Sequence, residues 1–243
     1  MCRRGNRRRR AGNATKRSDL TTIAVMQPYF VPYAGYFRLF AAADVVVMFD
    51  CVQFPRRGRV HRNLVPDAGG TPKWLTLPLE KAPRKTLIGD LRFAADAPSR
   101  LEREIRRFPV LQRARERGDP LLERVVAPTM RDAAAYLCGL VGTAARELGF
   151  ERTLLRSSAL GIPRELRGQE RVVEIARRLG ATRYVNLSGG RGLYDRTRFT
   201  QAGIELRFLA PHGGSMVSIL PRLLSEPAAA LRQEILTETV LEA

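Results

Sequence analysis

Cysteine and histidine are scarce in this sequence, and neither is arranged as in a metal or disulfide site. The 243 residues include three cysteines, Cys2, Cys51 and Cys138, and no two of them form a CxxC pair. This spacing argues against a zinc site and against a disulfide framework. With only His61 and His212 as histidines, a metal site would need carboxylates that no spacing supplies, so we expect no metal.

Long apolar runs are also missing. The longest, residues 45–49, has the length of a strand and falls far short of the ~20 residues that span a bilayer. The N-terminus lacks the apolar core of a signal peptide. We therefore expect a cytoplasmic protein without a membrane span. A hydrophobic content of 44% and a charged content of 27% are ordinary for a globular chain.

Positive charge is in excess and unevenly distributed. The formal net charge is +18, and residues 1–17 carry eight basic side chains and no acidic one. We expect residues 1–20 to form a disordered basic tail, because this segment has almost no apolar side chains. The tail either contacts tRNA or another polyanion, or is an extension without a function of its own.

Buried strands alternate with amphipathic helices, which predicts an α/β fold. The opening β–loop–α–β pattern favours a Rossmann-like, mostly parallel sheet flanked by helices, with ligands bound beyond the carboxyl ends of the strands. Residues 50–73 are polar and rich in Pro, Gly and Arg, and we expect a long functional loop there. Strands are expected at 22–26, 45–49, 73–79, 87–93, 153–157, 183–187 and 204–209, and helices at 34–43 and 169–179. A helix or a pair of helices, interrupted near Pro128, is expected over 121–148.

The expected organisation inserts a helical segment into the α/β domain. An amphipathic pattern over residues 98–150 indicates a helical insertion or subdomain. The rest of the chain then divides into the tail at 1–20, an N-terminal half at 21–97, and a C-terminal half with terminal helices at 151–243.

The first candidate site is the segment QPYFVPYAGY at residues 27–36, which follows the first strand. Two prolines stiffen it, Gly35 allows close approach of the backbone, and Gln27, Tyr29, Tyr33 and Tyr36 offer polar groups and ring faces. The alternative is a packed loop with buried tyrosines. Residues 33–36 also resemble the phosphate-binding HxGH turn of nucleotidylyltransferases, but tyrosines supply no positive charge there.

The second candidate site is DCVQFPRRGRVHRN at residues 50–63. Asp50 ends a buried strand, where a carboxylate can act as a base, and Gln53 follows it. Arg57 and Arg62 can bind carboxylates or phosphates bidentately, and His61 can carry a proton near neutral pH. The alternative is a solvated basic loop.

The third candidate site is the segment around SGGRG at residues 188–192. A strand that leads into glycines offers free backbone N–H groups and a guanidinium, which together can hold an anion. The alternative is a tight connection without a ligand. The candidate binding residues are Asn186, Ser188, Gly189, Gly190, Arg191 and Tyr194.

These segments, in this order, resemble the WbqC-like family. The stretches IAVMQPYFVPYAGYFRLF, VQFPRRGRVHRN, WLTLPLEKA and YVNLSGGRGLYD carry the resemblance, which spans roughly residues 23–209. It implies a role in O-antigen or natural-product biosynthesis, where an amino sugar or amino acid is modified, often by amide formation. It also adds Asn63 and Lys81 to the expected binding residues.

Two positions depart from that family. Cys51 stands where an acidic or amide residue is usual, and it is either a nucleophile or a packed thiol. Near the C-terminus, Pro221 replaces the aspartate of the family's Ser-Ile-Ile-Asp segment. If that acid serves catalysis, the substrate or the reaction differs in this chain.

The leading hypothesis is a transferase or amide-forming enzyme. Its substrate would be a small amine, a carboxylate or a nucleotide-activated amino sugar, with a nucleotide as the one cofactor considered. Asp50 or His61 would accept the proton of the amine, and Tyr33 and Gln27 would complete the catalytic group. The alternatives are a nucleic-acid-binding or tRNA-dependent protein, a degenerate nucleotidylyltransferase-like binding protein, or a non-catalytic pathway partner. The sequence leaves the oligomeric state open.

Overall fold

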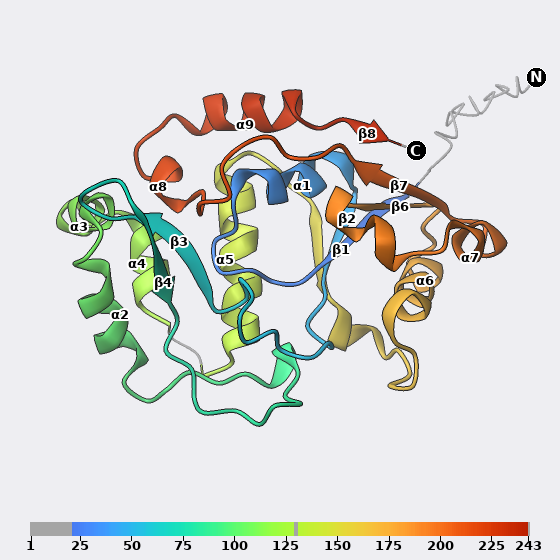
Figure 1. Ribbon diagram of the computed structural model, residues 1–243, viewed down its shortest axis with the longest axis horizontal. Coiled ribbons are helices and arrows are strands. Elements are labelled where there is room, and N and C mark those ends of the chain that lie inside the picture. The colour runs from blue at the N-terminus through green and yellow to red at the C-terminus, as the bar shows by residue number, and fades with distance from the viewer. Residues whose placement is uncertain (1–20, 129–130, 243) are drawn as a thin grey trace, which may run out of the picture.

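A six-stranded sheet forms the centre of the protein (Figure 1). The computed structural model describes residues 21–128 and 131–242, so the tail expected at 1–20 lies outside the described residues. All neighbouring strands are parallel except the last pair. The strand order is β5 (Thr153–Arg156), β2 (Val45–Met48), β1 (Thr22–Met26), β6 (Arg183–Asn186), β7 (Glu205–Leu209) and β8 (Leu241–Glu242).

The strand order reverses at β1. From β1 the chain moves outward through β2 to β5, and it then returns to the other side of β1 to form β6 and β7. The register aligns Ile23 with Val45 and with Tyr184, so the carboxyl ends of β2, β1 and β6 lie along one edge. In open α/β sheets, ligands bind at this edge, near the point where the strand order reverses.

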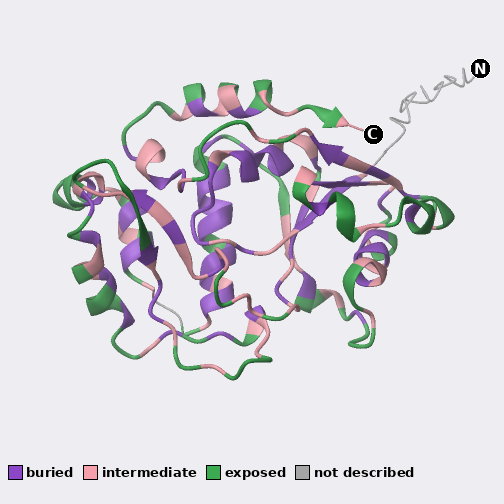
Figure 2. Ribbon diagram, viewed as in Figure 1, coloured by how far each residue is buried: buried purple, intermediate pink, exposed green. Residues whose placement is uncertain are grey.

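Alternate side chains of the strands enter two separate apolar cores, one on each face of the sheet. Ala24 lies in the first core with side chains of α1 (Arg38–Ala42), α5 (Ala133–Glu147) and α9 (Ala228–Thr237). Ile23 and Val25 lie in the second core with side chains of α6 (Gly168–Arg178) and α7 (Arg196–Gln201). Period-two alternation explains this division, because successive side chains of a strand point to opposite faces. Figure 2 shows α5 buried along nearly its whole length.

A helical layer and a β-hairpin extend the first core. The helices are α2 (Ala97–Ile105), α3 (Pro109–Glu116) and α4 (Pro120–Val126), and the hairpin consists of β3 (Arg62–Pro66) and β4 (Pro72–Thr76). The side chain of Asp119 accepts hydrogen bonds from the backbone N–H groups of Leu121 and Leu122, which caps the first turn of α4. The shorter elements are η1 (Ala34–Phe37), η2 (Ile88–Asp90), η3 (Ser157–Leu160), η4 (Ser188–Leu193) and α8 (Leu220–Leu223).

The predicted α/β fold with a mostly parallel sheet and a helical region is confirmed, and two local predictions were wrong. The loop expected at 50–73 contains β3. The strand expected at 73–79 is present as β4, which ends earlier, at Thr76. The strand expected at 87–93 is the short helical turn η2 with single bridges on either side. No helix among the described residues has the length and apolar character required to cross a membrane.

Candidate functional site

Asp50 lies at the carboxyl end of β2, fully buried and saturated with hydrogen bonds. Its Oδ1 accepts from Ser157 Oγ at 2.9 Å and from Ser158 N at 2.8 Å. Its Oδ2 accepts from Ser158 Oγ at 2.7 Å and from Arg156 Nε at 2.7 Å. These donors follow or end β5, which is the parallel neighbour of β2, so the pairing of the two strands brings them to the carboxylate.

The pKa of Asp50 lies below its ordinary value. Burial raises it, but the hydrogen bonds from Ser158, Arg156 and Ser157 stabilise the ionised carboxylate and outweigh burial. An ionised carboxylate with four donors is a weak proton acceptor, and it holds its neighbours in fixed positions. The geometry therefore favours Asp50 as an anchor of the site, while its predicted role as a base stays a prediction.

Cys51 follows Asp50 and is half-buried. The hydroxyl of Ser157 lies 3.0 Å from its Sγ, and Arg171 Nη1 donates to the sulfur at 3.2 Å. The guanidinium is oriented by the carbonyl oxygens of Leu166 (2.8 Å) and Pro163 (2.7 Å), which accept from its Nε and Nη2. Donors fixed in this way stabilise negative charge that develops on sulfur.

A cavity of about 1040 Å³ opens above these groups, and we call it the Asp50 cavity. The N-terminus of α6 borders it at Arg167 and Gly168, and within residues 21–128 and 131–242 no side-chain hydrogen bond caps that helix end. Uncapped backbone N–H groups at a helix start attract anions. The cationic residues of its lining are Lys85, Arg156, Arg164, Arg167 and Arg171, and the acidic ones are Asp50, Asp90 and Glu165.

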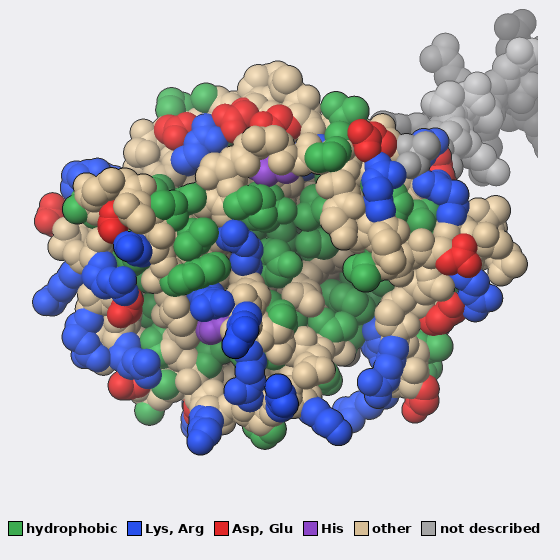
Figure 3. Space-filling model, viewed as in Figure 1, with side chains coloured by type: hydrophobic (Ala, Val, Ile, Leu, Met, Phe, Trp, Pro, Cys, Tyr) green, Lys and Arg blue, Asp and Glu red, His purple; other side chains and the backbone are tan. Residues whose placement is uncertain are grey.

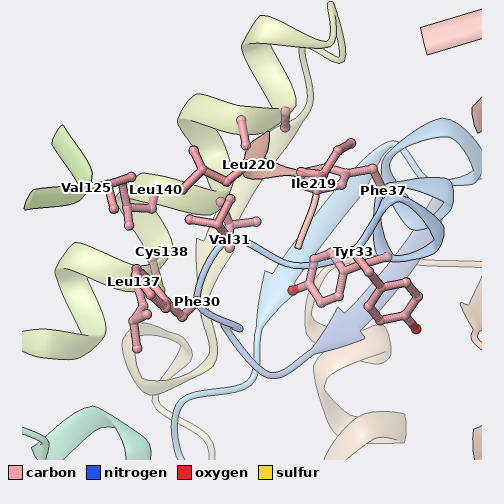
Figure 4. Packing of buried hydrophobic residues seen from close by; sticks show 14 of the residues in the cluster. Phe30, Val31, Tyr33, Phe37, Val125, Leu137, Cys138, Leu140, Ile219 and Leu220 are labelled. Atoms are coloured by element: carbon pink, nitrogen blue, oxygen red, sulfur yellow. The ribbon is translucent and has the colours of Figure 1, made fainter. Parts of the chain in front are cut away.

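The QPYFVPYAGY segment at residues 27–36 is a rigid loop that packs on the first core, and we call it the Tyr-rich loop. Figure 4 shows Phe30 and Val31 directed toward α5, whereas Tyr33 points away from it. Tyr36 is fully buried, and its hydroxyl donates to the carbonyl oxygen of Gln27 at 2.9 Å. The ring of Tyr29 lies 5.6 Å from that of Tyr36. Tyr36 therefore supports the loop from inside, and its predicted role in substrate binding stays a prediction.

Val31 is held in a conformation that β-branched residues avoid. Its φ is 34°, inside the left-handed region. Its carbonyl oxygen accepts from Asn63 Nδ2 at 2.8 Å and from Ser218 Oγ at 2.6 Å. Asn63 also donates to the carbonyl oxygen of Phe30 at 3.0 Å, so this predicted binding residue positions the loop. Backbone strain of this kind costs about 1–3 kcal/mol and persists only where neighbours enforce it.

The residues predicted in the 50–63 segment separate into two places. Gln53 lines the Asp50 cavity, and its Nε2 donates to the carbonyl oxygen of Arg84 at 2.8 Å. His61 lies in a different groove, where the centre of its ring is 5.0 Å from the centre of the Phe54 ring. Burial, and then the nearby Arg62 charge, lower the pKa of His61 to about 4, so its imidazole is neutral at pH 7.

Three more of the predicted binding residues lie away from the Asp50 cavity or already contact other protein groups. They are Arg57, Arg62 and Lys81. Arg62 Nη2 donates to the carbonyl oxygen of Arg57 at 3.0 Å, and its guanidinium lies 4.3 Å from the ring centre of Trp74. Lys81 lines the same groove as His61. The single cluster expected from this part of the sequence is therefore divided between two concave surfaces.

The SGGRG segment forms η4 at the carboxyl end of β6. Asn186 is buried, and its Oδ1 accepts from the backbone N–H of Leu187 at 2.8 Å. A Cβ on Gly190 would lie 2.5 Å from Asn186 Nδ2, so this close approach requires glycine. Arg191 forms an ion pair with Glu242 of β8. The hydroxyl groups of Tyr194 and Tyr184 form a hydrogen bond at 3.0 Å. A role for Ser188 and Gly189 in binding an anion stays a prediction.

Several residues of the Asp50 cavity were not predicted. Arg156, Ser157, Ser158 and Arg171 were not singled out, although Ser157 ends and Ser158 directly follows the strand expected at 153–157. Their position at a carboxyl strand end was the available signal. Arg171 sits inside a helix and had no such signal.

Residues 27–215 match the WbqC-like protein family, and this range includes the Tyr-rich loop, the Asp50 cavity and SGGRG. An uncharacterized protein of Mycobacterium tuberculosis is 31% identical over 58 residues, which are 24% of this chain and 25% of that protein. The crystal structure of a zinc-bound AdcAII variant of Streptococcus pneumoniae covers 88% of this chain and 99% of its own. Its identity is 13% and its TM-score 0.22, too low to support an argument about fold or ligand. The family match covers most of the chain, which therefore belongs to the WbqC-like protein family.

Proposed function

We propose that this chain is a biosynthetic transferase or amide-forming enzyme that binds the anionic part of a small substrate in the Asp50 cavity. The observation that carries the proposal is the fixed guanidinium of Arg171, which lies beside a half-buried thiol and an uncapped helix start. The cavity is large enough for a nucleotide-activated sugar, because ligand pockets for such molecules measure about 300–1,000 Å³. Carboxylate or phosphate oxygens of the substrate would face Arg171 and the N-terminus of α6.

Cys51 is the nucleophile best placed for acyl transfer in this cavity. Its thiolate would attack the carbonyl carbon of an activated carboxylic acid, such as a thioester or an acyl phosphate, and expel the activating group. The substrate amine would then attack the resulting Cys51 thioester, release the thiolate and lose a proton to solvent, which yields the amide. Asp50 would hold Ser157 and Arg156 in position during both steps.

Protection from alkylation tests the binding site. The full chain is treated with iodoacetamide, with and without pyrophosphate or a nucleoside diphosphate sugar, and the modification of Cys51 and Cys138 is followed by peptide mass spectrometry. We expect Cys51 to react and the anions to slow its alkylation at least fivefold, and we expect Cys138 to stay unmodified because it is buried. An Arg171→Met variant should lose the protection. Equal alkylation of Cys51 with and without every anion would refute this site.

Turnover tests the reaction. Nucleoside diphosphate amino sugars are offered with acyl thioesters, and amide products are detected by liquid chromatography and mass spectrometry. A Cys51→Ser variant should lose at least a hundredfold in rate. Arg124→Ala, a substitution of an exposed arginine on α4, should leave the rate unchanged. Equal rates for wild type and Cys51→Ser would exclude the thioester route while leaving the binding site intact.

A further inference from the structure

A second concave surface lies between the hairpin and α2, and we call it the hairpin groove. It has a volume of about 750 Å³ and includes His61, Trp74 of β4 and Arg103 of α2. It shares no lining residue with the Asp50 cavity, and Phe54 of the groove donates from its backbone N to the carbonyl oxygen of Thr86 at 2.9 Å. The function proposed for the Asp50 cavity leaves this groove unused.

Positive charge dominates the hairpin groove. Its cationic residues are Arg56, Lys73, Lys81, Arg100, Arg103 and Arg107, and its acidic residues are Glu80 and Glu104. Both acids are already paired, Glu104 with Arg107 at 2.8 Å and Glu80 with Arg131 at 2.6 Å.

Three of these cations are free. Within residues 21–128 and 131–242, the side chains of Lys73, Lys81 and Arg103 have neither a hydrogen bond nor an ion pair, and all three are exposed. Unpaired cations that converge on one groove attract a ligand with several negative charges.

Aromatic surface and an unsatisfied polar atom accompany this charge. Trp74 is 37% exposed, although large aromatic side chains are usually more buried. Arg62 lies over its ring at 4.3 Å and Arg59 at 5.8 Å. His61 Nδ1 is buried without a hydrogen-bond partner in the described structure. A ligand with phosphates, flat rings and polar ring edges would engage all of these groups.

We propose that the hairpin groove binds single-stranded RNA, with backbone phosphates on Lys73, Lys81 and Arg103 and a base stacked against Trp74. Proteins that bind single strands combine a cationic groove with aromatic platforms in this way. A strand is favoured over a single nucleotide because the cationic surface continues beyond the groove. Figure 3 shows Lys and Arg side chains spread over the side of the molecule that carries α2 and the hairpin, and along the loops below.

The fluorescence of Trp74 reports on this groove directly, because the chain contains one tryptophan. The full chain is titrated with a 12-nucleotide oligouridylate at 50 to 200 mM KCl, and both tryptophan quenching and the anisotropy of a labelled strand are measured. We expect saturable quenching that follows the anisotropy. Affinity should fall steeply with salt, since phosphate contacts release counterions.

A matched pair of double variants locates the binding. Lys81→Ala with Arg103→Ala removes two free cations of the groove, and we expect about tenfold weaker binding. The slope of log affinity against log salt should decrease by about 1.4. Arg124→Ala with Arg177→Ala removes the same charge from exposed positions on α4 and α6 and should change affinity less than twofold. A Trp74→Ala variant should bind about tenfold more weakly with an unchanged salt slope.

Three results would overturn the proposal. The first is the absence of RNA binding at 50 mM KCl. The second is binding without quenching of Trp74 and with equal losses in the two double variants, which would assign the RNA to the tail at 1–17. The third is uridine triphosphate binding as tightly as the oligonucleotide, which would identify a site for a small anion. Alkylation of Cys51 serves as an independent readout, because it reports only on the Asp50 cavity.

Discussion

At the scale of single residues, buried polar groups of this protein act mainly on their neighbours. Asp50 accepts four hydrogen bonds, and Asn63 donates two to the strained Tyr-rich loop. Both residues were predicted to contact substrate directly, because sequence reveals which groups can form hydrogen bonds but not whether the protein already satisfies them. Satisfied groups of this kind set the shape of a site.

Substitution of Asp50 should therefore affect folding before chemistry. An Asp50→Asn change places an amide N–H₂ against donors and removes the buried charge partner of Arg156, which keeps only the longer ion pair with Asp132 at 3.3 Å. We expect the free energy of unfolding to fall by about 3 kcal/mol, as measured by urea denaturation. Asp90→Asn, which alters an exposed carboxyl of the same cavity, serves as the control and should change it by less than about 0.5 kcal/mol. Equal stability of Asp50→Asn and wild type would show that the donors find other partners.

At the scale of elements, the position of the short helix η1 depends on a close contact that only glycine permits. A Cβ on Gly35 of η1 would lie 2.6 Å from His212 Cγ and 2.8 Å from Tyr33 Cε2. His212 is itself fixed by Glu238, whose Oε2 lies 2.9 Å from Nδ1. The His212 ring therefore has little freedom to move away, and a residue larger than glycine at position 35 must displace the Tyr-rich loop.

Two glycine substitutions separate this contact from helix propensity. Gly35→Ala should lower the free energy of unfolding by about 2–3 kcal/mol, because the added methyl overlaps two fixed rings. Gly139→Ala, on the exposed face of α5 with open space around it, should raise it by about 0.5–1 kcal/mol. Thermal unfolding monitored by circular dichroism measures both changes. A stabilising Gly35→Ala substitution would mean that His212 moves freely.

Strands and helices were predicted well where the burial pattern of the segment indicates its structure, and poorly where pairing with another strand determines it. The apolar runs of β1 and β2 and the amphipathic pattern of α6 indicate their structure locally, and all three form. The strand β4 was expected, but β3 and its pairing with β4 were missed because Arg and Pro obscure the alternation, although Asp67 and Gly70, with φ of 78°, mark the turn. The reverse error occurred at η2, where the stretch expected as a strand forms only isolated bridges with Gln53, Leu79 and Asp132 in the part of the chain that the structure describes.

At the scale of the whole molecule, the stability of the protein should depend on pH through His61. Its pKa in the folded chain is about 4, against 6.5 for the free side chain, because burial and Arg62 disfavour the imidazolium. Between these values the unfolded chain binds more protons, so the free energy of unfolding falls as the pH decreases from about 6.5 to 4. Because the imidazole is partly exposed, solvent screening reduces the full linkage effect, and the loss should reach about 2 kcal/mol.

Urea denaturation at several pH values between 7 and 4 measures this dependence. A His61→Gln variant lacks the titrating group and should show a flatter profile, while carboxylates contribute equally to both proteins. Parallel profiles of the two proteins would contradict the buried, neutral state of His61.

The sequence by itself determined the α/β class, most strands and the helix α6, because burial and periodicity are local properties. Asp50 and Gln53 line one cavity, and their part in a functional site stays a prediction. Only the tertiary structure decided which polar groups meet. Cys51 meets Ser157 and Arg171, residues 106 and 120 positions away, because β2 pairs with β5 and the start of α6 lies nearby. The hairpin of β3 and β4 is a separate sheet, and His61 and Lys81, which flank it in the chain, lie in the hairpin groove and not beside Asp50. Contacts of this range depend on the order of strands in the sheet, which no local pattern encodes.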